Sequence, residues 1–176
     1  GLRHLSLGGA KPNPVDALVY TGIELCRKEN VDFVLGIGGG SAIDSAKAIA
    51  AGVPYEGDFW DFFSNKAKPG TVLPHGCIIT LPATGTEGSD SAVITRESDM
   101  LKRGMSAECN RPLFAIMNPE LTFTLPPYQS ACGVADMMSH ILERYFTNTR
   151  NVEVTDRIAE ALLMTIVRNG PIILRE

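Results

Sequence analysis

The chain has 176 residues and a mass of 19.0 kDa, a length that corresponds to one or two domains. It is 44% hydrophobic and 20% charged, with a formal net charge of −4. This composition excludes an intrinsically disordered chain, and the chain lacks the basic surplus of nucleic-acid-binding proteins. Uncharged apolar stretches such as 33–43 and 76–86 are shorter than the ~20 apolar residues of a membrane-spanning helix. We therefore expect a globular protein that binds neither nucleic acid nor membrane.

Cysteine usage and the first residues bear on the compartment. The sequence has four widely spaced cysteines and no C-x-x-C pair: Cys26, Cys77, Cys109 and Cys132. This is too sparse for a disulfide scaffold, so we expect reduced thiols and a cytoplasmic protein. Residues 1–4 continue into a Gly/Pro-rich segment rather than an apolar one, and we expect no signal peptide.

The first elements alternate between strand and helix. Leu5–Leu7 alternates as a short strand does. Asn13 and Pro14 are residue types that favour a helix N-cap and first turn, and apolar residues at helical spacing continue to about Glu29. The sequence therefore predicts a strand followed by a helix in this region.

A second strand and helix follow directly. The continuous apolar run 33–37 predicts a strand buried on both faces. Glycines end this run, and residues 42–51 are strong helix formers. The resulting βαβα order predicts an α/β fold with a parallel sheet. Further extended segments are expected after a short aromatic piece at 59–63, namely 76–81, 92–95, a segment near Met105, and 113–117.

The composition changes near residue 125. After this point the pattern is helical in two segments, 127–147 and 152–174, the second with a bend or break at Gly170–Pro171. We therefore predict an α/β domain over residues 1–125 and the beginning of an all-α domain over 126–176.

The glycine turn Gly38–Ser41 joins a predicted strand to a helix N-terminus. Free backbone N–H groups and the positive end of the helix dipole suit a phosphate there, and glycine lets the ligand approach the backbone. The full dinucleotide and P-loop fingerprints are absent from the sequence. A plain tight turn, with Ser41 and Asp44 forming a variant capping box, remains an equal alternative.

Two further segments carry chemistry-bearing residues. Thr80–Ser89 ends a buried strand in small hydroxyl residues, where open α/β sheets bind ligands, although a polar surface loop is the alternative. Asp136 and His140, four residues apart on a predicted helix, share one face and can share a divalent ion. A solvated surface pair is the alternative, because metal sites normally use three or four protein ligands.

Taken together and in this order, five motifs resemble the iron-containing alcohol dehydrogenase family, most closely its NADP-dependent butanol dehydrogenase and aldehyde reductase branch. The motifs are Lys11–Pro14, Gly38–Ser41 with Asp44 and Lys47, Thr80–Glu87, Leu125–Pro127, and Gly133–Val134 with Asp136 and His140. The resemblance covers the whole chain and implies a parallel-sheet dinucleotide-binding domain of the dehydroquinate-synthase-like type, followed by a helical metal-binding domain.

The resemblance also implies roles for individual residues. The cofactor would be bound by Gly39, Gly40, Ser41 and Asp44 at its pyrophosphate, and by Thr80, Thr84, Ser89, Ser91, Lys102 and Leu121 along its groove. Asp136 and His140 would be metal ligands, for Fe2+ or Zn2+. Family members are about twice as long and supply further ligands later in the chain, so we expect this sequence to be an internal piece with little or no activity alone.

The implied activity is hydride transfer between NAD(P)(H), with NADP favoured, and a small primary alcohol or aldehyde. A homodimer or larger homo-oligomer is implied for the full-length enzyme. Two alternatives remain: a glycerol-dehydrogenase-like or dehydroquinate-synthase-like enzyme, and a metal-free nucleotide-binding module.

Overall fold

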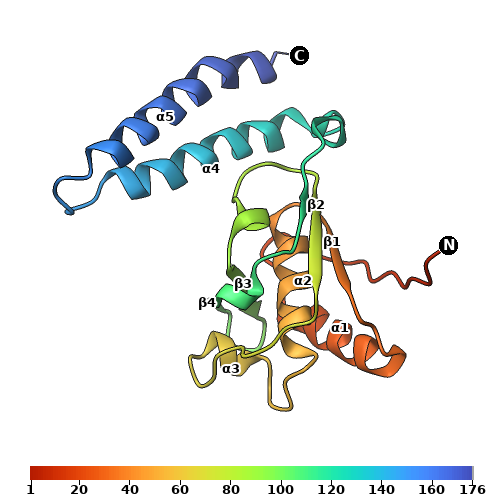
Figure 1. Cartoon of the computed structure of the whole chain (residues 1–176). Helices are drawn as coiled ribbons and strands as arrows, with labels where there is room; N and C mark the ends of the chain where they lie inside the picture. The colour runs from red at the N-terminus through yellow and green to blue at the C-terminus, as the bar shows by residue number, and fades with distance from the viewer. Residues whose placement is uncertain (176) are drawn as a thin grey trace. The chain divides into compact units, whose positions relative to one another are not determined.

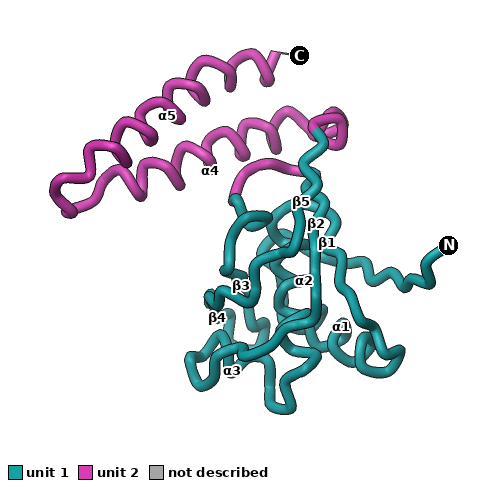
Figure 2. The backbone as a smooth tube through the Cα atoms, viewed as in Figure 1, with its two compact units in different colours: residues 1–80, 85–118 teal, residues 81–84, 119–176 magenta. Residues whose placement is uncertain are grey.

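The computed structural model describes residues 1–175, and the chain divides into two compact units (Figure 2). The first unit comprises residues 1–80 and 85–118, and the second comprises residues 81–84 and the chain from Pro119 onward. The first unit contains, in order, α1 (Asp16–Glu29), β1 (Val34–Gly38), α2 (Gly40–Gly52), α3 (Trp60–Phe63), β2 (His75–Ile79), η1 (Thr86–Gly88), β3 (Ser91–Arg96), β4 (Leu101–Ser106), η2 (Glu108–Asn110) and β5 (Ala115–Ile116). The second contains η3 (Pro119–Thr122), α4 (Pro127–Tyr145) and α5 (Glu153–Ile173).

The first unit contains a three-stranded parallel sheet of order β1-β2-β5, of which Figure 1 labels β1 and β2 side by side. Helix α2 packs on β1 and β2, and α1 packs on α2. This confirms the predicted α/β class with a parallel sheet. The prediction that β1 is buried on both faces is wrong: Gly36 is buried under α2, but Leu35 and Ile37 on the opposite face are 43% and 59% exposed. Alternate side chains of a strand point to opposite faces, and the described helices of this unit cover only one.

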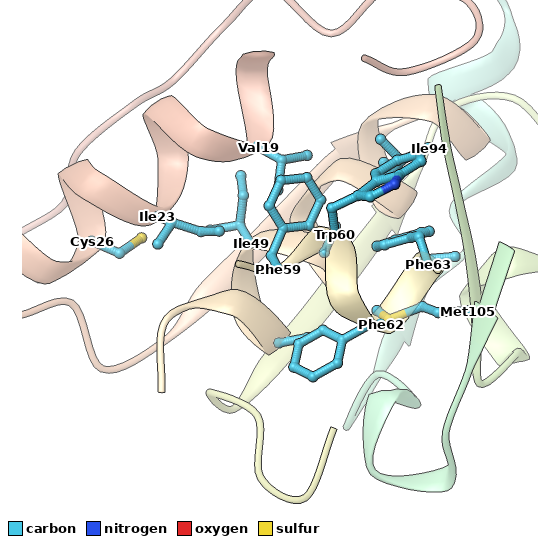
Figure 3. Close-up of a cluster of buried hydrophobic side chains, with 13 residues drawn as sticks. Val19, Ile23, Cys26, Ile49, Phe59, Trp60, Phe62, Phe63, Ile94 and Met105 are labelled. Carbon is cyan, nitrogen blue, oxygen red and sulfur yellow. The ribbon is translucent and has the colours of Figure 1, made fainter. Parts of the chain in front are cut away.

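The strands β3 and β4 form a separate antiparallel pair. Ala92, Ile94 and Met105 from this pair are buried in the main hydrophobic core together with the aromatic segment of α3 (Figure 3). Within that segment the rings of Trp60 and Phe63 stack with centroids 5.5 Å apart. The aromatic piece predicted from the sequence is thus a core element that joins the hairpin to α1 and α2.

The N-terminal segment differs from the prediction in two ways. Leu5–Leu7 forms no strand, because within the described residues no neighbouring strand pairs with it, and both leucines are exposed. Asn13 is not a helix cap: its φ is +57°, and α1 begins at Asp16 after Val15. The carbonyl of Pro14 instead accepts a hydrogen bond of 2.8 Å from the Thr95 amide. The Asn13 turn therefore places the chain beside β3 before the helix starts.

The second unit is an antiparallel helical hairpin. The hydroxyl of Tyr145, at the end of α4, donates to the Glu160 carboxylate of α5 at 3.2 Å, and Gly170 of α5 lies against Val134 of α4. The break expected at Gly170–Pro171 is absent from α5, which continues to Ile173, because a proline in the last turn removes only one backbone hydrogen bond there. Within residues 1–175, no helix combines the length and apolarity needed to cross a membrane.

Candidate cofactor and metal site

The glycine turn forms the junction between β1 and α2. Gly38 has φ +147°, and a Cβ there would lie 2.8 Å from the Cβ of Ala42, so this position requires glycine. Gly39 is the N-cap residue, and its carbonyl accepts the amides of Ala42 and Ile43 at 3.1 and 3.2 Å. Among the described residues, no side chain caps this helix end, and the capping-box interpretation of Ser41 and Asp44 is wrong. The N–H groups of the first turn therefore suit an anion, as at other helix N-termini.

The ends of β1 and β2 lie together at this turn. The amide of Thr80, directly after β2, donates to the carbonyl of Gly38 at 3.0 Å. Because both strands are parallel, their carboxyl ends meet at one edge of the sheet, where open α/β sheets bind ligands. The structure therefore brings Thr80 next to Gly38 of the glycine turn.

Asp44 lies one turn further along α2 and is bound to the 86–93 segment. Its Oδ1 accepts the Thr86 hydroxyl at 2.6 Å, and its Oδ2 accepts the Val93 amide at 2.9 Å. Burial raises the pKa of Asp44 above its ordinary value, although these hydrogen bonds oppose the shift. Asp44 thus connects the helix of the glycine turn to the segment that contains Ser89 and Ser91.

Lys47, for which the sequence predicted no individual role, is fully buried. Its Nζ donates to the carbonyls of Thr86, Ser89 and Ser91 at 2.6, 2.7 and 2.9 Å, and also lies 3.0 Å from the Thr86 hydroxyl. Burial lowers the pKa of Lys47, and the nearby Asp44 carboxylate acts in the opposite direction. The spacing of residues in the sequence could not identify this role, because the groups that accept from Lys47 are backbone carbonyls 39 to 44 residues away.

Ser91 and Lys102 lie on the same face of the β3–β4 pair. The register pairs Ser91 with Ser106 and Thr95 with Lys102, and alternate residues of a strand share a face. The Lys102 Nζ donates to the Asn13 side-chain oxygen at 2.9 Å, while the Ser91 and Ser106 hydroxyls lie 3.2 Å apart. Asn13 was predicted only as a helix cap, and its contact with Lys102 adds it to the polar residues on this face.

The second unit holds the remaining candidates. Residues 81–84, which include Thr84, lie against α4: a Cβ on Gly133 would be 2.7 Å from the carbonyl oxygen of Pro82. Leu121 lies in η3 and is 40% exposed. Gly133 therefore allows the 81–84 segment to approach α4 one turn before Asp136.

Asp136 and His140 lie on successive turns of α4. The Nε2 atom of His140 is 3.6 Å from Oδ2 of Asp136, and the two side chains are 47% and 43% exposed, respectively. An imidazole and a carboxylate suit Fe2+ or Zn2+ as donors. Among residues 1–175, no group of three or more His, Cys, Asp or Glu side chains comes together. The pair fits as part of a metal site but does not complete one.

The predicted residues therefore divide between the two units. The first unit contains most of the cofactor candidates: Gly39, Gly40, Ser41, Asp44, Thr80, Ser89, Ser91 and Lys102. The second unit contains Thr84, Leu121, Asp136 and His140.

Known proteins resemble the chain along almost its whole length. NADH-dependent butanol dehydrogenase A of Clostridium acetobutylicum is 48% identical over 166 residues, which are 94% of this chain and 43% of that protein. The NADPH-dependent aldehyde reductase YqhD of Escherichia coli is 38% identical over 179 aligned residues, which cover 100% of this chain and 46% of that protein. The chain thus spans slightly less than half the length of these relatives.

A solved structure and a family model agree with these relatives. The crystal structure of NADH-dependent butanol dehydrogenase A from Thermotoga maritima matches with a TM-score of 0.93 at 43% identity, over 96% of this chain and 42% of that one. The family model described as iron-containing alcohol dehydrogenase matches residues 1–119. The chain therefore belongs to the iron-containing alcohol dehydrogenase family.

Proposed function

We propose that the chain is the cofactor-binding part, with the first two metal ligands, of a metal-dependent alcohol dehydrogenase or aldehyde reductase. The whole enzyme transfers a hydride between a nicotinamide dinucleotide and a small primary alcohol or aldehyde. The observation that supports this most strongly is the uncapped glycine turn at the β1–α2 junction, next to Thr80, in a chain of this family.

The first unit binds the dinucleotide in this proposal. The N–H groups of Gly39, Gly40 and Ser41 bind the pyrophosphate, and the positive end of the α2 dipole favours its charge. Ser91 and Lys102, on one face of the β3–β4 pair, supply a hydroxyl and a cation to the rest of the cofactor. The roles of Ser89, Thr84 and Leu121 stay predictions that rest on the family resemblance.

The metal-binding role rests on α4. Asp136 and His140 would hold Fe2+ or Zn2+ through a carboxylate oxygen and an imidazole nitrogen. When bound, the metal would act as a Lewis acid on the substrate oxygen. His140 serves as a ligand in this proposal, and no side-chain nucleophile is needed because the dinucleotide carries the hydride. With only two ligands in the described residues, we expect little or no turnover from this chain alone.

The choice of dinucleotide is a finer question. The sequence prediction favours NADP, but two of the three similar proteins described above are named as NADH-dependent and one as NADPH-dependent. A nicotinamide dinucleotide is thus the common property, and we propose to measure both forms.

Titration of NADH and of NADPH into the chain, followed by nicotinamide fluorescence, tests the proposal. We expect saturable binding of at least one form, with competition by ADP-ribose, which carries the same pyrophosphate. Glucose 6-phosphate, which has a phosphate but no dinucleotide, is the control and should not compete. Failure of both NADH and NADPH to bind would contradict the proposal.

A further inference from the structure

We propose that Lys47 is a positioning residue for the cofactor, because it fixes the 86–91 loop against α2 in the conformation that receives the dinucleotide. This inference rests on the proposed dinucleotide site and adds a residue for which the sequence predicted no individual role. Lys47 lies on α2 two turns after the glycine turn, and its partners lie 39 to 44 residues away in the sequence.

The hydrogen bonds of Lys47 exclude a direct contact with the cofactor. Its ammonium group has three hydrogens, and the carbonyls of Thr86, Ser89 and Ser91 accept from it at 2.6 to 2.9 Å. Its side chain is 0% exposed. With every donor used inside the protein, Lys47 acts on the loop rather than on a ligand.

The loop backbone depends on this cation. Three carbonyl oxygens converge on one point, and without the ammonium their negative ends would repel one another in a buried position where water cannot replace it. The loop would then move until these carbonyls found other donors. Because Ser89 and Ser91 contribute two of the three carbonyls, their side chains would move with the backbone.

Asp44 supplies the negative charge next to the Lys47 ammonium and holds the same loop to α2 by hydrogen bonds of its own. The Thr86 hydroxyl donates to Asp44 Oδ1 at 2.6 Å and lies 3.0 Å from the Lys47 Nζ, so Thr86 bridges the two charges. Asp44 Oδ2 accepts the Val93 amide, which fixes the start of β3. We name this set, Asp44, Lys47 and Thr86, the α2 clamp. It holds both ends of the loop against the helix that begins at the glycine turn.

The substitution Lys47→Met tests the inference, since methionine is unbranched and fits a buried site but has neither charge nor N–H donors. We expect the affinity for NADH or NADPH to fall by about tenfold, because the free chain must then order the loop on binding. We also expect faster amide hydrogen exchange in residues 86–91 and unchanged exchange in α1. Lys66→Met is the matched control, because the Lys66 side chain is 74% exposed and its ion pair with Asp61 is long, at 3.8 Å.

The outcomes separate a positioning role from a merely structural one. The dinucleotide affinity is measured at a temperature well below the melting transitions of both the wild-type and the Lys47→Met chain. If Lys47→Met has a lower melting temperature but the wild-type affinity, the inference is overturned and the proposed function stays intact. Wild-type chain that binds neither dinucleotide would contradict the proposed function and the inference together. If Lys47→Met does not fold, Thr86→Val decides: about threefold weaker binding supports the α2 clamp, and wild-type affinity overturns it.

Discussion

The polar groups of the two units differ in how firmly the fold holds them. In the first unit, Lys47 is fully buried and donates to three loop carbonyls, and Asp44 accepts two hydrogen bonds. In the second, Asp136 and His140 are almost half exposed, and the nearest distance between their side chains is 3.6 Å. Buried hydrogen-bonded groups have one available geometry, whereas exposed side chains sample several rotamers.

This difference shows which function each unit can support alone. An anion site made of backbone N–H groups at a helix N-terminus is complete once the glycine turn is folded. A metal site made of two side chains on one helix lacks the third and fourth ligands that a stable site uses. We therefore expect this chain to bind a dinucleotide measurably, and to bind a metal ion only weakly.

The largest expected effect is on the buried groups of the first unit. Asp44→Ala leaves the Lys47 ammonium without its neighbouring carboxylate and the Val93 amide without its acceptor. We expect the free energy of unfolding to fall by about 3–5 kcal/mol, measured by urea denaturation. The exposed Asp32→Ala is the control and should change it by less than about 0.5 kcal/mol. A loss below about 1 kcal/mol for Asp44→Ala would show that the α2 clamp contributes little to stability.

The next effect concerns the glycine turn itself. Gly38→Ala introduces a side chain at φ +147° and a Cβ 2.8 Å from that of Ala42. We expect a loss of about 1–3 kcal/mol in unfolding free energy, together with weaker dinucleotide binding, because the turn must open. Gly70→Ala should have neither effect, because Gly70 lies outside the candidate site and within the described residues nothing lies within 4 Å of the added Cβ. If the two variants bound the dinucleotide with equal affinity, the glycine turn would not be part of the cofactor site.

A third substitution tests the second unit. Gly133→Ala places a Cβ 2.7 Å from the carbonyl oxygen of Pro82, so the 81–84 segment must move from α4. We expect a net loss of about 1–2 kcal/mol in thermal or urea unfolding. At Gly170 the nearest atom, 3.0 Å away, belongs to the Val134 side chain, which can adjust. Gly170→Ala should therefore be almost neutral, and a loss as large as that of Gly133→Ala would contradict this account of α4.

The smallest effect on stability, but the most informative one for function, is expected at the exposed pair. His140→Ala should change the unfolding free energy by less than about 0.5 kcal/mol. It should also lower Fe2+ or Zn2+ uptake in equilibrium dialysis, with His4→Ala as the control. Equal uptake by wild-type and His140→Ala chains would favour a metal-free nucleotide-binding module.

Much of the first unit could be predicted from the sequence because its signals are local. The apolar run around Leu35 and the glycines after it identify β1 and the turn into α2, and the structure confirms both. The antiparallel pairing of β3 with β4 was not predicted, because the sequence shows extended segments but not their partners. Likewise, the exposed face of β1 could not be predicted, because a continuous apolar run does not show what covers it.

The contacts that order the candidate site are of a different kind. Lys47 and Asp44 are three residues apart, which in a sequence is typical of a surface ion pair. Their actual partners, Thr86 and Val93, are 39 to 49 residues further along. Asn13 was predicted as a helix cap because of its residue type, yet it adopts positive φ and accepts a hydrogen bond from Lys102. Tertiary contacts decided these roles.

The most direct test of the central claim, that the first unit holds a dinucleotide at its glycine turn, is an amide NMR titration of the labelled chain with NADH and with NADPH. We predict the largest chemical-shift changes at the amides of Gly39, Gly40 and Ser41, with further changes in residues 86–91 and none in α1. Shift changes that are absent, or confined to residues outside the glycine turn and the 86–91 loop, would contradict the account.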